Sequence, residues 1–254
     1  MSICRLDGRR IVITGGASGM GEGMVRAFPG LGAGVVSLDV AEDAGAAIAK
    51  DAGARFVAAD VSAADSVTAA FAEAAGLLGG LDVLIHAAGI SPSSAAEASS
   101  IELFHATLNV NTLGTMLTNQ AAFGYMRDAG GTILNFASAA GIIGQPNKSV
   151  YSMSKGAVVA WTRTAAQEWA RYGIRVNMVA PAIWTPMYDK TRSEMTPEVL
   201  AAHDEQLSKL IPLGGRLGDV RSQFIPVMAF YASEGASFLT GQLIPVDGGA
   251  LMQR

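Results

Sequence analysis

The chain has 254 residues, half of them hydrophobic and only 16% charged. This composition supports a sizeable buried core and excludes an intrinsically disordered protein. The net charge is −4 and the chain carries no basic run, which argues against nucleic acid as a partner. The single cysteine, Cys4, excludes an intramolecular disulfide and fits the reducing cytoplasm.

The N-terminal residues carry charges but no apolar stretch behind them, so we expect no signal peptide. No apolar run in the sequence reaches the ~20 residues that a membrane-spanning helix needs. We therefore expect no membrane partner, and a cytoplasmic location.

Short strand-like runs alternate with longer helical stretches along the chain. Continuous apolar strands separated by helices are typical of a parallel sheet covered on both faces, and right-handed crossovers then give a doubly wound fold. We predict an α/β fold with one Rossmann-type parallel sheet of about seven strands, in a single domain spanning residues 1–254. The predicted strands are 11–15, 35–39, 55–59, 83–87, 132–137, 174–180 and 242–246, and the predicted helices lie near 19–28, 43–52, 65–78, 100–128, 150–172 and 220–232.

Local signals mark several boundaries. Pro29 should end the first helix, and the run 99–102 (Ser-Ser-Ile-Glu) is typical of a capping box at the start of a helix. The segment 183–212 breaks the alternation and combines prolines with aromatic and Met side chains. We predict that it is an insertion over the carboxyl edge of the sheet, forming a substrate lid in which Lys190 and Arg192 are surface charges.

The first predicted strand leads into the glycine-rich run 14–21, Thr-Gly-Gly-Ala-Ser-Gly-Met-Gly. Gly15, Gly19 and Gly21 let the backbone approach a pyrophosphate closely, and Ser18 and Met20 lie between them. The helix that follows directs its free N–H groups and its positive dipole end at the phosphates. Placed between a strand and a helix, this run predicts a dinucleotide site.

Asp39 ends the second predicted strand, 18 residues after Gly21. A carboxylate there can accept hydrogen bonds from the adenosine ribose hydroxyls and repels a 2′-phosphate, and residues 40–42 offer no cation. This predicts NAD rather than NADP, although Asp39 also fits a turn at the end of a strand. Asp60 and Val61 end the third strand, where they either frame the adenine or open the next helix.

Tyr151 and Lys155 stand four residues apart, and Ser138 lies thirteen residues before Tyr151. Residues four apart share one face of a helix. A free tyrosine titrates near ~10, and the Lys155 ammonium beside its oxygen would favour the ionised form, as would a cationic nicotinamide. The group then predicts a general acid/base for an alcohol oxygen. Taken alone, the spacing also fits an exposed tyrosine with a lysine neighbour.

Together these motifs resemble the short-chain dehydrogenase/reductase family over about residues 8–249. The run 14–21 matches the cofactor loop of the family, and Ser138, Tyr151 and Lys155 match its catalytic set. Asn111 matches the fourth catalytic position, because its spacing to the following glycine fits better than that of Asn109. Residues 175–177 (Arg-Val-Asn) and 181–185 (Pro-x-x-x-Thr) match the segments beside the nicotinamide, and 246–249 (Val-Asp-Gly-Gly) matches the C-terminal turn.

Three positions depart from the family pattern. His86 and Ala87 replace the two amides of the usual Asn-Asn-Ala-Gly, and we expect His86 to be a core or cofactor-edge residue rather than a catalytic base. Ala182 replaces the glycine that usually follows Pro181. Ala137 replaces the first serine of the usual pair, which leaves the match of Ser138 intact.

The resemblance implies a mechanism in which Tyr151 accepts the proton of a secondary alcohol while hydride passes to NAD. Ser138 then binds the substrate oxygen, Lys155 also contacts the nicotinamide ribose, and Asn111 holds a water that links Lys155 to solvent. No metal is implied. The cofactor site expected from the motifs consists of Gly15, Ser18, Gly19, Met20, Gly21, Asp39, Asp60, Val61, Ala88, Gly89, Tyr151, Lys155, Pro181, Ile183 and Thr185.

The apolar side chains of 183–212 and 141–144 favour a hydrophobic alcohol or ketone, although they also fit lid packing or a subunit interface. A 3-oxoacyl-thioester reductase and a non-catalytic NAD-binding regulator are the alternatives. Asp39 argues against the first, and the intact catalytic set argues against the second. The resemblance also implies a homotetramer built on helices 100–128 and 150–172. The alanines of the second helix (157, 160, 165 and 166) equally fit packing within the chain.

Overall fold

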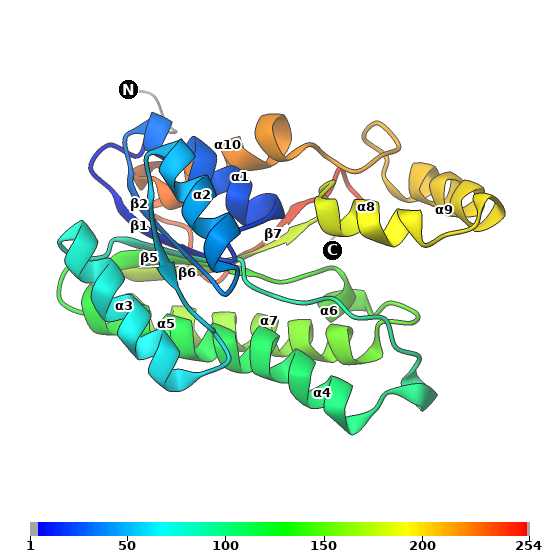
Figure 1. Ribbon diagram of the computed structural model, residues 1–254, viewed down its shortest axis with the longest axis horizontal. Helices are drawn as coiled ribbons and strands as arrows, with labels where there is room; N and C mark the ends of the chain where they lie inside the picture. Colours follow the sequence, from blue (N-terminus) through cyan, green and yellow to red (C-terminus); the bar gives the residue numbers. More distant parts are fainter. Residues whose placement is uncertain (1–4, 253–254) are drawn as a thin grey trace.

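A computed structural model describes residues 5–252. Within that range, seven parallel strands form one sheet in the order β3-β2-β1-β4-β5-β6-β7 (Figure 1). Each predicted strand is present with its ends shifted by no more than one residue, which confirms the doubly wound α/β fold. The strands are β1 (Arg10–Thr14), β2 (Gly34–Asp39), β3 (Arg55–Ala58), β4 (Val83–His86), β5 (Gly131–Phe136), β6 (Ile174–Pro181) and β7 (Leu243–Val246).

Successive side chains of the central strands enter two separate cores. Ile11 and Ile13 of β1 pack on one face of the sheet, and Val12 between them packs on the other. In β4, Ile85 and Leu84 divide between the two faces in the same way. The strands are therefore continuously apolar because both faces of the sheet are covered.

The helices form one layer on each face (Figure 1). Phe28 and Met228 lie in the core under the first layer, and Phe71 and Met126 lie in the core under the second. The first layer consists of α1 (Gly19–Ala27), α2 (Glu42–Ala52) and α10 (Ile225–Ala232), and the second of α3 (Ala64–Leu78), α5 (Gly114–Met126) and α7 (Ser149–Trp169).

The order of the strands places a crevice at the carboxyl ends of β1 and β4. The chain runs from β1 through β2 to β3 toward one edge, and from β4 onward it builds toward the other edge. Because the crossovers diverge between these two strands, the loops after them leave the sheet on opposite sides. The glycine-rich loop after Thr14 and the loop after His86 therefore border the same crevice.

The predicted helix 100–128 is interrupted. It consists of α4 (Ile101–Leu108), a π-helical segment η3 (Asn109–Leu113) and α5. Its N-cap is Ser100 rather than Ser99, with Oγ accepting a hydrogen bond of 3.1 Å from the N–H of Leu103. The predicted helix 220–232 likewise begins with a π-helical turn, η5 (Val220–Phe224). A one-residue insertion of this kind leaves little trace in a hydrophobic pattern, which is why the sequence did not reveal it.

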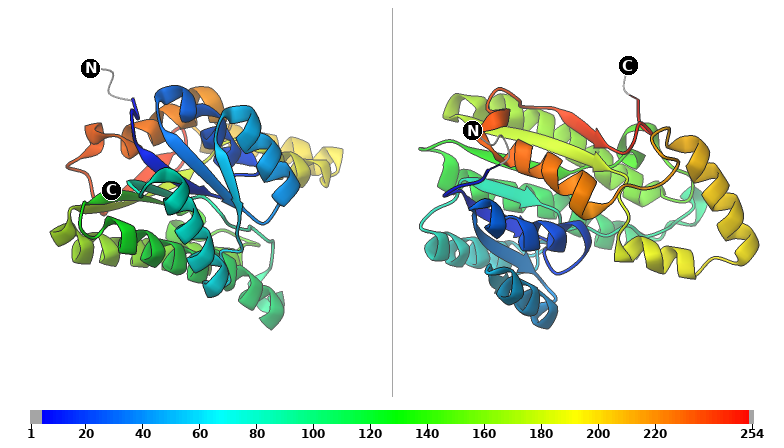
Figure 2. Two further views of the ribbon diagram at one scale, coloured as in Figure 1. Left: turned by 60° about the vertical axis from the view of Figure 1, so that its left-hand side comes forward. Right: turned by 90° about the horizontal axis from the view of Figure 1, so that it is seen from above.

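The predicted lid contains two helices, α8 (Pro186–Ser193) and α9 (Pro197–Leu210), which project beyond the carboxyl edge of the sheet (Figures 1 and 2). Arg192, predicted as a surface charge, is partly exposed and has defined partners in the lid. Its guanidinium lies 5.0 Å from the ring centroid of Trp184 and forms an ion pair with Asp204 of α9. A planar guanidinium stacks readily on aromatic faces, so Arg192 fastens the two lid helices together.

Two predictions concern contacts of the chain with a membrane and with other subunits. Within residues 5–252, no helix combines the length and apolarity that a bilayer crossing requires. Ala165 and Ala166 of α7 are buried in the core of the chain itself, whereas Ala160 is exposed. Cys4 lies outside the described residues, so the prediction of an unpaired thiol is not tested.

A buried amide pair joins the second helix layer to the sheet. Asn119 of α5 and Asn135 of β5 exchange two hydrogen bonds of 2.9 Å each. Thr162 of α7 lies 3.0 Å from the Asn135 amide, and the Trp161 indole N–H donates to Asn119 at 3.0 Å. Each amide satisfies the other, so the loss of one leaves a buried polar group without its partner.

We expect Asn135→Leu to lower the free energy of unfolding by about 1–3 kcal/mol, because it leaves the Asn119 amide buried and unpaired. Urea unfolding measures the loss. The double variant Asn119→Leu/Asn135→Leu is the control, and it should recover part of the stability. A single variant as stable as wild type would contradict the assignment.

Candidate active site

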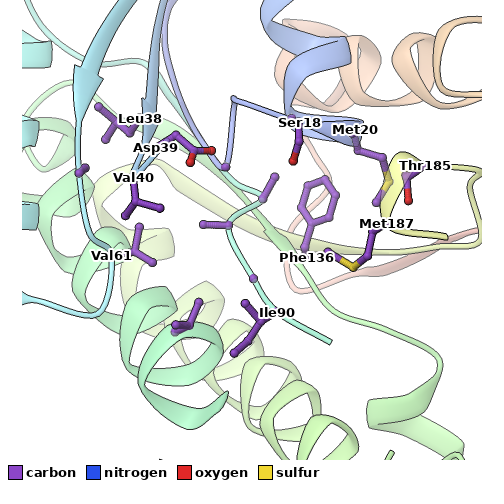
Figure 3. A pocket seen from close by; sticks show the side chains of 18 of the residues that line it. Ser18, Met20, Leu38, Asp39, Val40, Val61, Ile90, Phe136, Thr185 and Met187 are labelled. Carbon is purple, nitrogen blue, oxygen red and sulfur yellow. The ribbon is translucent and has the colours of Figure 1, made fainter. Parts of the chain in front are cut away.

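A cavity of about 510 Å³ opens at the carboxyl ends of the central strands. Leu38, Asp39 and Val40 lie at one end of it, and Met20 and Met187 lie at the other (Figure 3). Most of the predicted cofactor residues line this cavity, namely Gly15, Ser18, Gly19, Met20, Gly21, Asp39, Asp60, Val61, Ala88, Gly89 and Thr185.

The glycine-rich loop allows a close approach of backbone to backbone. Gly15 has a φ of +70°, and a Cβ on it would lie 2.7 Å from the N atom of Ala88. A Cβ on Gly21 would lie 1.9 Å from the carbonyl oxygen of Gly15. The side chain of Ser18, at the N-cap of α1, makes no capping hydrogen bond. The N-terminal N–H groups of α1 are thus left for an anion, which fits a pyrophosphate.

Asp39 forms the predicted turn at the end of β2 and lines the cavity, and its contact with a ribose stays a prediction. Its Oδ2 accepts a hydrogen bond of 3.0 Å from the N–H of Ala17, and its Oδ1 accepts one of 3.0 Å from the N–H of Ala41. The carboxylate is therefore a turn residue that braces the glycine-rich loop. Each carboxylate oxygen has further acceptor capacity and can still bind a ribose hydroxyl. Val40 beside it is 67% exposed and offers no positive charge.

Asp60 shapes a turn and also lines the cavity. Its Oδ1 accepts hydrogen bonds from the N–H and the hydroxyl of Ser62, at 2.9 and 2.7 Å. These bonds shape the turn that leads into α3, and the same residue lines the cavity next to Val61.

Sequence reasoning missed the rest of the cavity wall. Most of these side chains are apolar and sit next to residues that were predicted, so position at a strand end is the signal that could have found them. Phe136, the last residue of β5, is an example (Figure 3). The missed residues are Leu38, Val40, Ala59, Ser62, Ala87, Ile90, Val110, Phe136, Pro186 and Met187.

Four predicted cofactor residues do not line this cavity. Ile183 packs its side chain into the core and forms a β-bridge with Gly218. Pro181 ends β6 and pairs with Val246 of β7. Tyr151 and Lys155 lie on α7 and do not line the cavity, although a Cβ on Gly89 of the cavity wall would lie 3.5 Å from Lys155 Nζ.

The Lys155 ammonium is buried against the end of β5. Its side chain donates a hydrogen bond of 2.7 Å to the carbonyl oxygen of Phe136. A Cβ on Gly141 would lie 2.5 Å from the Lys155 carbonyl carbon, so the short helix α6 (Ala140–Ile143) packs closely on α7 at this point. Burial lowers the pKa of Lys155 to about 8. The charged form is therefore held there against a desolvation penalty.

Tyr151 lies with its ring centroid 5.9 Å from Lys155 Nζ. The expected lowering of its pKa is wrong. Burial raises the pKa of the Tyr151 phenol, and hydrogen bonds to the side chains of Ser138 and Ser91 oppose that effect. The Lys155 side chain donates its hydrogen bond to the Phe136 carbonyl. Its charge on the same helical face therefore does not offset the rise in the pKa of Tyr151 that desolvation causes.

Ser138 follows β5, and a hydrogen bond from its side chain is the largest effect that opposes the rise in the pKa of the Tyr151 phenol. The contact of Ser138 with a substrate oxygen stays a prediction. Its Oγ accepts a hydrogen bond of 3.2 Å from the N–H of Ala140, which orients the side chain at the start of α6. Ala137 is buried, and its N–H bonds to Val179 of β6 at 2.8 Å. The serine missing at position 137 thus leaves the placement of Ser138 unchanged.

Asn111 lies in the π-helical segment η3 and is fully buried. Its Oδ1 accepts from the N–H of Ile90 and its Nδ2 donates to the carbonyl of Ile90, each at 2.9 Å. Nδ2 also donates to Ser154 Oγ of α7 at 2.9 Å. Asn111 therefore clamps the loop after β4 to α7. The water predicted between Asn111 and Lys155 stays a prediction.

His86 is a core residue, as expected, and not a base. Its Nδ1 lies 2.9 Å from Thr14 Oγ1 of β1 and 3.0 Å from Thr118 Oγ1 of α5. Burial, with a smaller effect of the Lys155 charge, lowers its pKa to about 3, so the imidazole is neutral at pH 7. It takes the place of an amide by linking the sheet to the helix layer.

Comparison with known proteins agrees with this geometry. A family model described as Enoyl-(Acyl carrier protein) reductase matches residues 15–250. The chain is 34% identical to the L-fucose dehydrogenase of Bos taurus over 97% of its own length and 90% of that protein. The chain belongs to the short-chain dehydrogenase/reductase family. It is an alcohol dehydrogenase that uses a nicotinamide cofactor.

Other members of the short-chain dehydrogenase/reductase family show the same extent of similarity. The cis-4-hydroxycyclohexanecarboxylate dehydrogenase of Sinomonas cyclohexanicum is 37% identical, over 95% of this chain and 96% of that one. The 2,5-dichloro-2,5-cyclohexadiene-1,4-diol dehydrogenase of Sphingobium indicum is 33% identical, over 96% and 97%. The crystal structure of levodione reductase superposes with a TM-score of 0.86 at 32% identity, over 96% of this chain and 98% of that chain.

The buried ammonium predicts a specific dependence of stability on pH. Unfolded lysine keeps its proton to about 10.4, whereas folded Lys155 loses it near pH 8. The unfolded state thus binds more protons between these values, and the free energy of unfolding rises with pH in that window. The penalty is fully present below pH 8.

Relative to Lys155→Met, wild type should gain up to about 3 kcal/mol of stability between pH 7 and pH 10. Urea unfolding of both proteins at several pH values measures the difference in their free energies of unfolding. The other titratable groups are common to both proteins, so their contributions to this difference cancel. Parallel pH profiles for the two proteins would contradict the burial of a charged lysine.

Proposed function

We propose that the protein oxidises a secondary alcohol on a six-membered ring, and reduces the matching ketone, with NAD(H) as cofactor. The observation that carries this proposal is the Tyr151 ring, whose centroid lies 5.9 Å from the buried ammonium of Lys155. Hydrogen bonds to Ser138 and Ser91 oppose the rise in the pKa of its phenol that burial causes. A phenol held by hydroxyl groups next to a dinucleotide cavity is suited to exchange a proton with an alcohol oxygen.

Each residue of the site has its own role in the proposed reaction. Tyr151 exchanges the proton, Ser138 binds and orients the substrate oxygen, and Lys155 binds the nicotinamide ribose and adds positive charge near the phenol. Asn111 positions the loop after β4 that closes the site, through its bonds to Ile90. NAD accepts the hydride and, when oxidised, carries a positive charge.

Ketone reduction and alcohol oxidation need different protonation states of Tyr151. Burial raises the pKa of the phenol, so unless a nearby positive charge lowers that pKa, the phenol is protonated at neutral pH. It is then ready to donate a proton to a ketone oxygen. Alcohol oxidation needs the phenolate, which nearby positive charge and the hydroxyl of Ser138 favour.

The proposal of NAD over NADP rests on Asp39. Its carboxylate lies at the end of β2 with acceptor capacity to spare. A 2′-phosphate at the same place would meet this negative charge, with the exposed residues Val40 and Glu42 as its neighbours. We assign Pro181 and Ile183 a role through their backbone, because the Ile183 side chain is buried in the core.

The proposal of a largely hydrophobic ring substrate rests on exposed apolar side chains of α6 and the lid. Ile142 and Ile143 follow Ser138 on α6, and Trp184 and Met187 lie at the base of the lid. The relatives named above for a hydroxycyclohexanecarboxylate and a cyclohexadiene diol support a ring alcohol. The L-fucose dehydrogenases show that related enzymes also take a polar sugar.

We also propose one domain with the lid at 183–212, a homotetramer and a cytoplasmic location. Exposed Ile101 of α4 and Met153 of α7 are available for contacts between subunits. Light scattering that gave a monomeric mass would contradict the tetramer. The alternative of a 3-oxoacyl-thioester reductase predicts turnover of an acyl-thioester ketone with NADPH, which the same activity assays would detect.

Tyr151→Phe should lower kcat for a ring alcohol by about 10²–10⁴-fold while leaving NADH binding within a few-fold of wild type. Absorbance of the reduced cofactor follows turnover on a panel of cyclohexanols, cyclohexanediols and their ketones. Tyr125→Phe, at an exposed position of α5, is the matched control and should keep full activity. Undiminished activity of Tyr151→Phe would overturn the proposal.

Asp39→Asn should reduce the preference for NAD over NADP in kcat/KM by about tenfold or more, because it removes the charge that repels a 2′-phosphate. Asp43→Asn, in the first turn of α2, changes a nearby carboxylate and should leave the preference unaltered. A wild-type enzyme that prefers NADP would refute the cofactor assignment.

A further inference from the structure

A second lysine lies beside the proposed acid/base. Lys148 Nζ is 5.9 Å from the ring centroid of Tyr151, the same distance as Lys155 Nζ. Lys148 precedes α7, and the segment that carries it is fixed. It forms a parallel β-bridge with Ser94, whose N–H donates to the carbonyl of Asn147 at 2.9 Å.

The Lys148 ammonium is anchored on the loop after β4. It donates a hydrogen bond of 2.8 Å to the backbone carbonyl of Ser91, and Ser91 Oγ lies 3.2 Å away. Ser91 follows Ile90 of the cavity wall, and a hydrogen bond from its side chain is among the causes that oppose the rise in the pKa of the Tyr151 phenol. The Lys148 ammonium therefore lies close both to the Tyr151 ring and to the loop that lines the cavity.

The charge of Lys148 has no counterion in the part of the chain that the structure describes. No carboxylate between residues 5 and 252 lies within ion-pair distance of it, whereas Lys209 pairs with Glu205. Both acceptors of Lys148 belong to the neutral Ser91. An ammonium has three donors, so its hydrogen bonds to Ser91 leave capacity for a further acceptor. Partial burial lowers the pKa of Lys148 and raises the benefit of an anionic partner.

We propose that Lys148 and Ser91 bind a carboxylate of the substrate, so that the preferred substrates are ring alcohols that carry an acid group. This inference rests on the proposed oxidation of a ring alcohol at Tyr151. An ammonium beside a hydroxyl can bind a carboxylate through charge-assisted hydrogen bonds.

A different use of Lys148 is to stabilise the phenolate of Tyr151 directly. The geometry favours substrate binding, because Lys148 is bonded to Ser91 and not to the phenol oxygen. The two uses predict different results. A charge that acts on Tyr151 affects every substrate, whereas a charge that binds a carboxylate affects only the acids.

The test compares hydroxycyclohexanecarboxylates, with the acid at the 2, 3 or 4 position, with the methyl ester of each. For wild type we expect kcat/KM to be higher for at least one acid than for its ester. Lys148→Met should reduce that ratio by about 10- to 100-fold, mainly through KM, and should leave turnover of the ester within about twofold. Lys148→Arg should restore much of the preference. Lys50→Met, at an exposed position of α2, is the matched control.

A second readout needs no turnover. Cyclohexanecarboxylate should bind the wild-type complex with NADH more tightly than methyl cyclohexanecarboxylate does, and Lys148→Met should abolish that difference in calorimetry. Equal loss of acid and ester turnover in Lys148→Met, with a shifted pH profile, would overturn the inference in favour of an effect on Tyr151. Turnover of neutral ring alcohols with no preference for acids would overturn it while leaving the proposed function intact. Failure of the proposed function itself would show as undiminished activity of Tyr151→Phe.

Discussion

The buried ammonium of Lys155 is the constraint on which the rest of the site depends. A charge in this position is costly, and its bond to the Phe136 carbonyl offsets part of that cost. The bond ties α7 to the end of β5, and the close contact at Gly141 ties α6 to α7. Tyr151, one turn before Lys155, is thereby held at a fixed height above the sheet, next to Ser138. Small displacements of α7 would separate all of these groups at once.

The fold and the cofactor loop were predictable because their signals are local. Each strand is a short apolar run, and the glycines at 15 and 21 stand where a side chain would meet backbone. The roles of Asn111 and Arg192 were not predictable in the same way. Their partners, Ile90 and Asp204, become neighbours only when the loop and the lid fold back. The sequence places them in a segment but does not say what they touch.

The pKa of Tyr151 shows a second limit of sequence reasoning. The spacing to Lys155 correctly places both side chains on α7, but spacing does not report depth of burial. Desolvation and the direction of the lysine side chain decide the result. The protonation state of His86 also depends on burial that the sequence does not report. Its neutral imidazole joins two threonine hydroxyls in the core. In the proposed function the cofactor contacts the strand ends of the sheet, whereas the substrate contacts the loop after β4, α6 and the lid, and loops of this kind vary more between relatives than the strands do.

The π-helical turn at Asn111 has a consequence for how this helix can vary. A π-turn contains one residue more than the corresponding α-helical turn, and each residue of an α-helix advances it by about 100°. Deleting a single residue from 109–113 would relax the turn into regular helix. The flanking helices α4 and α5 would keep nearly the same rotation relative to each other, but the widened turn from which the amide of Asn111 reaches Ile90 would be lost. Length changes are therefore expected to be tolerated in the loop before α4, but not within these five residues.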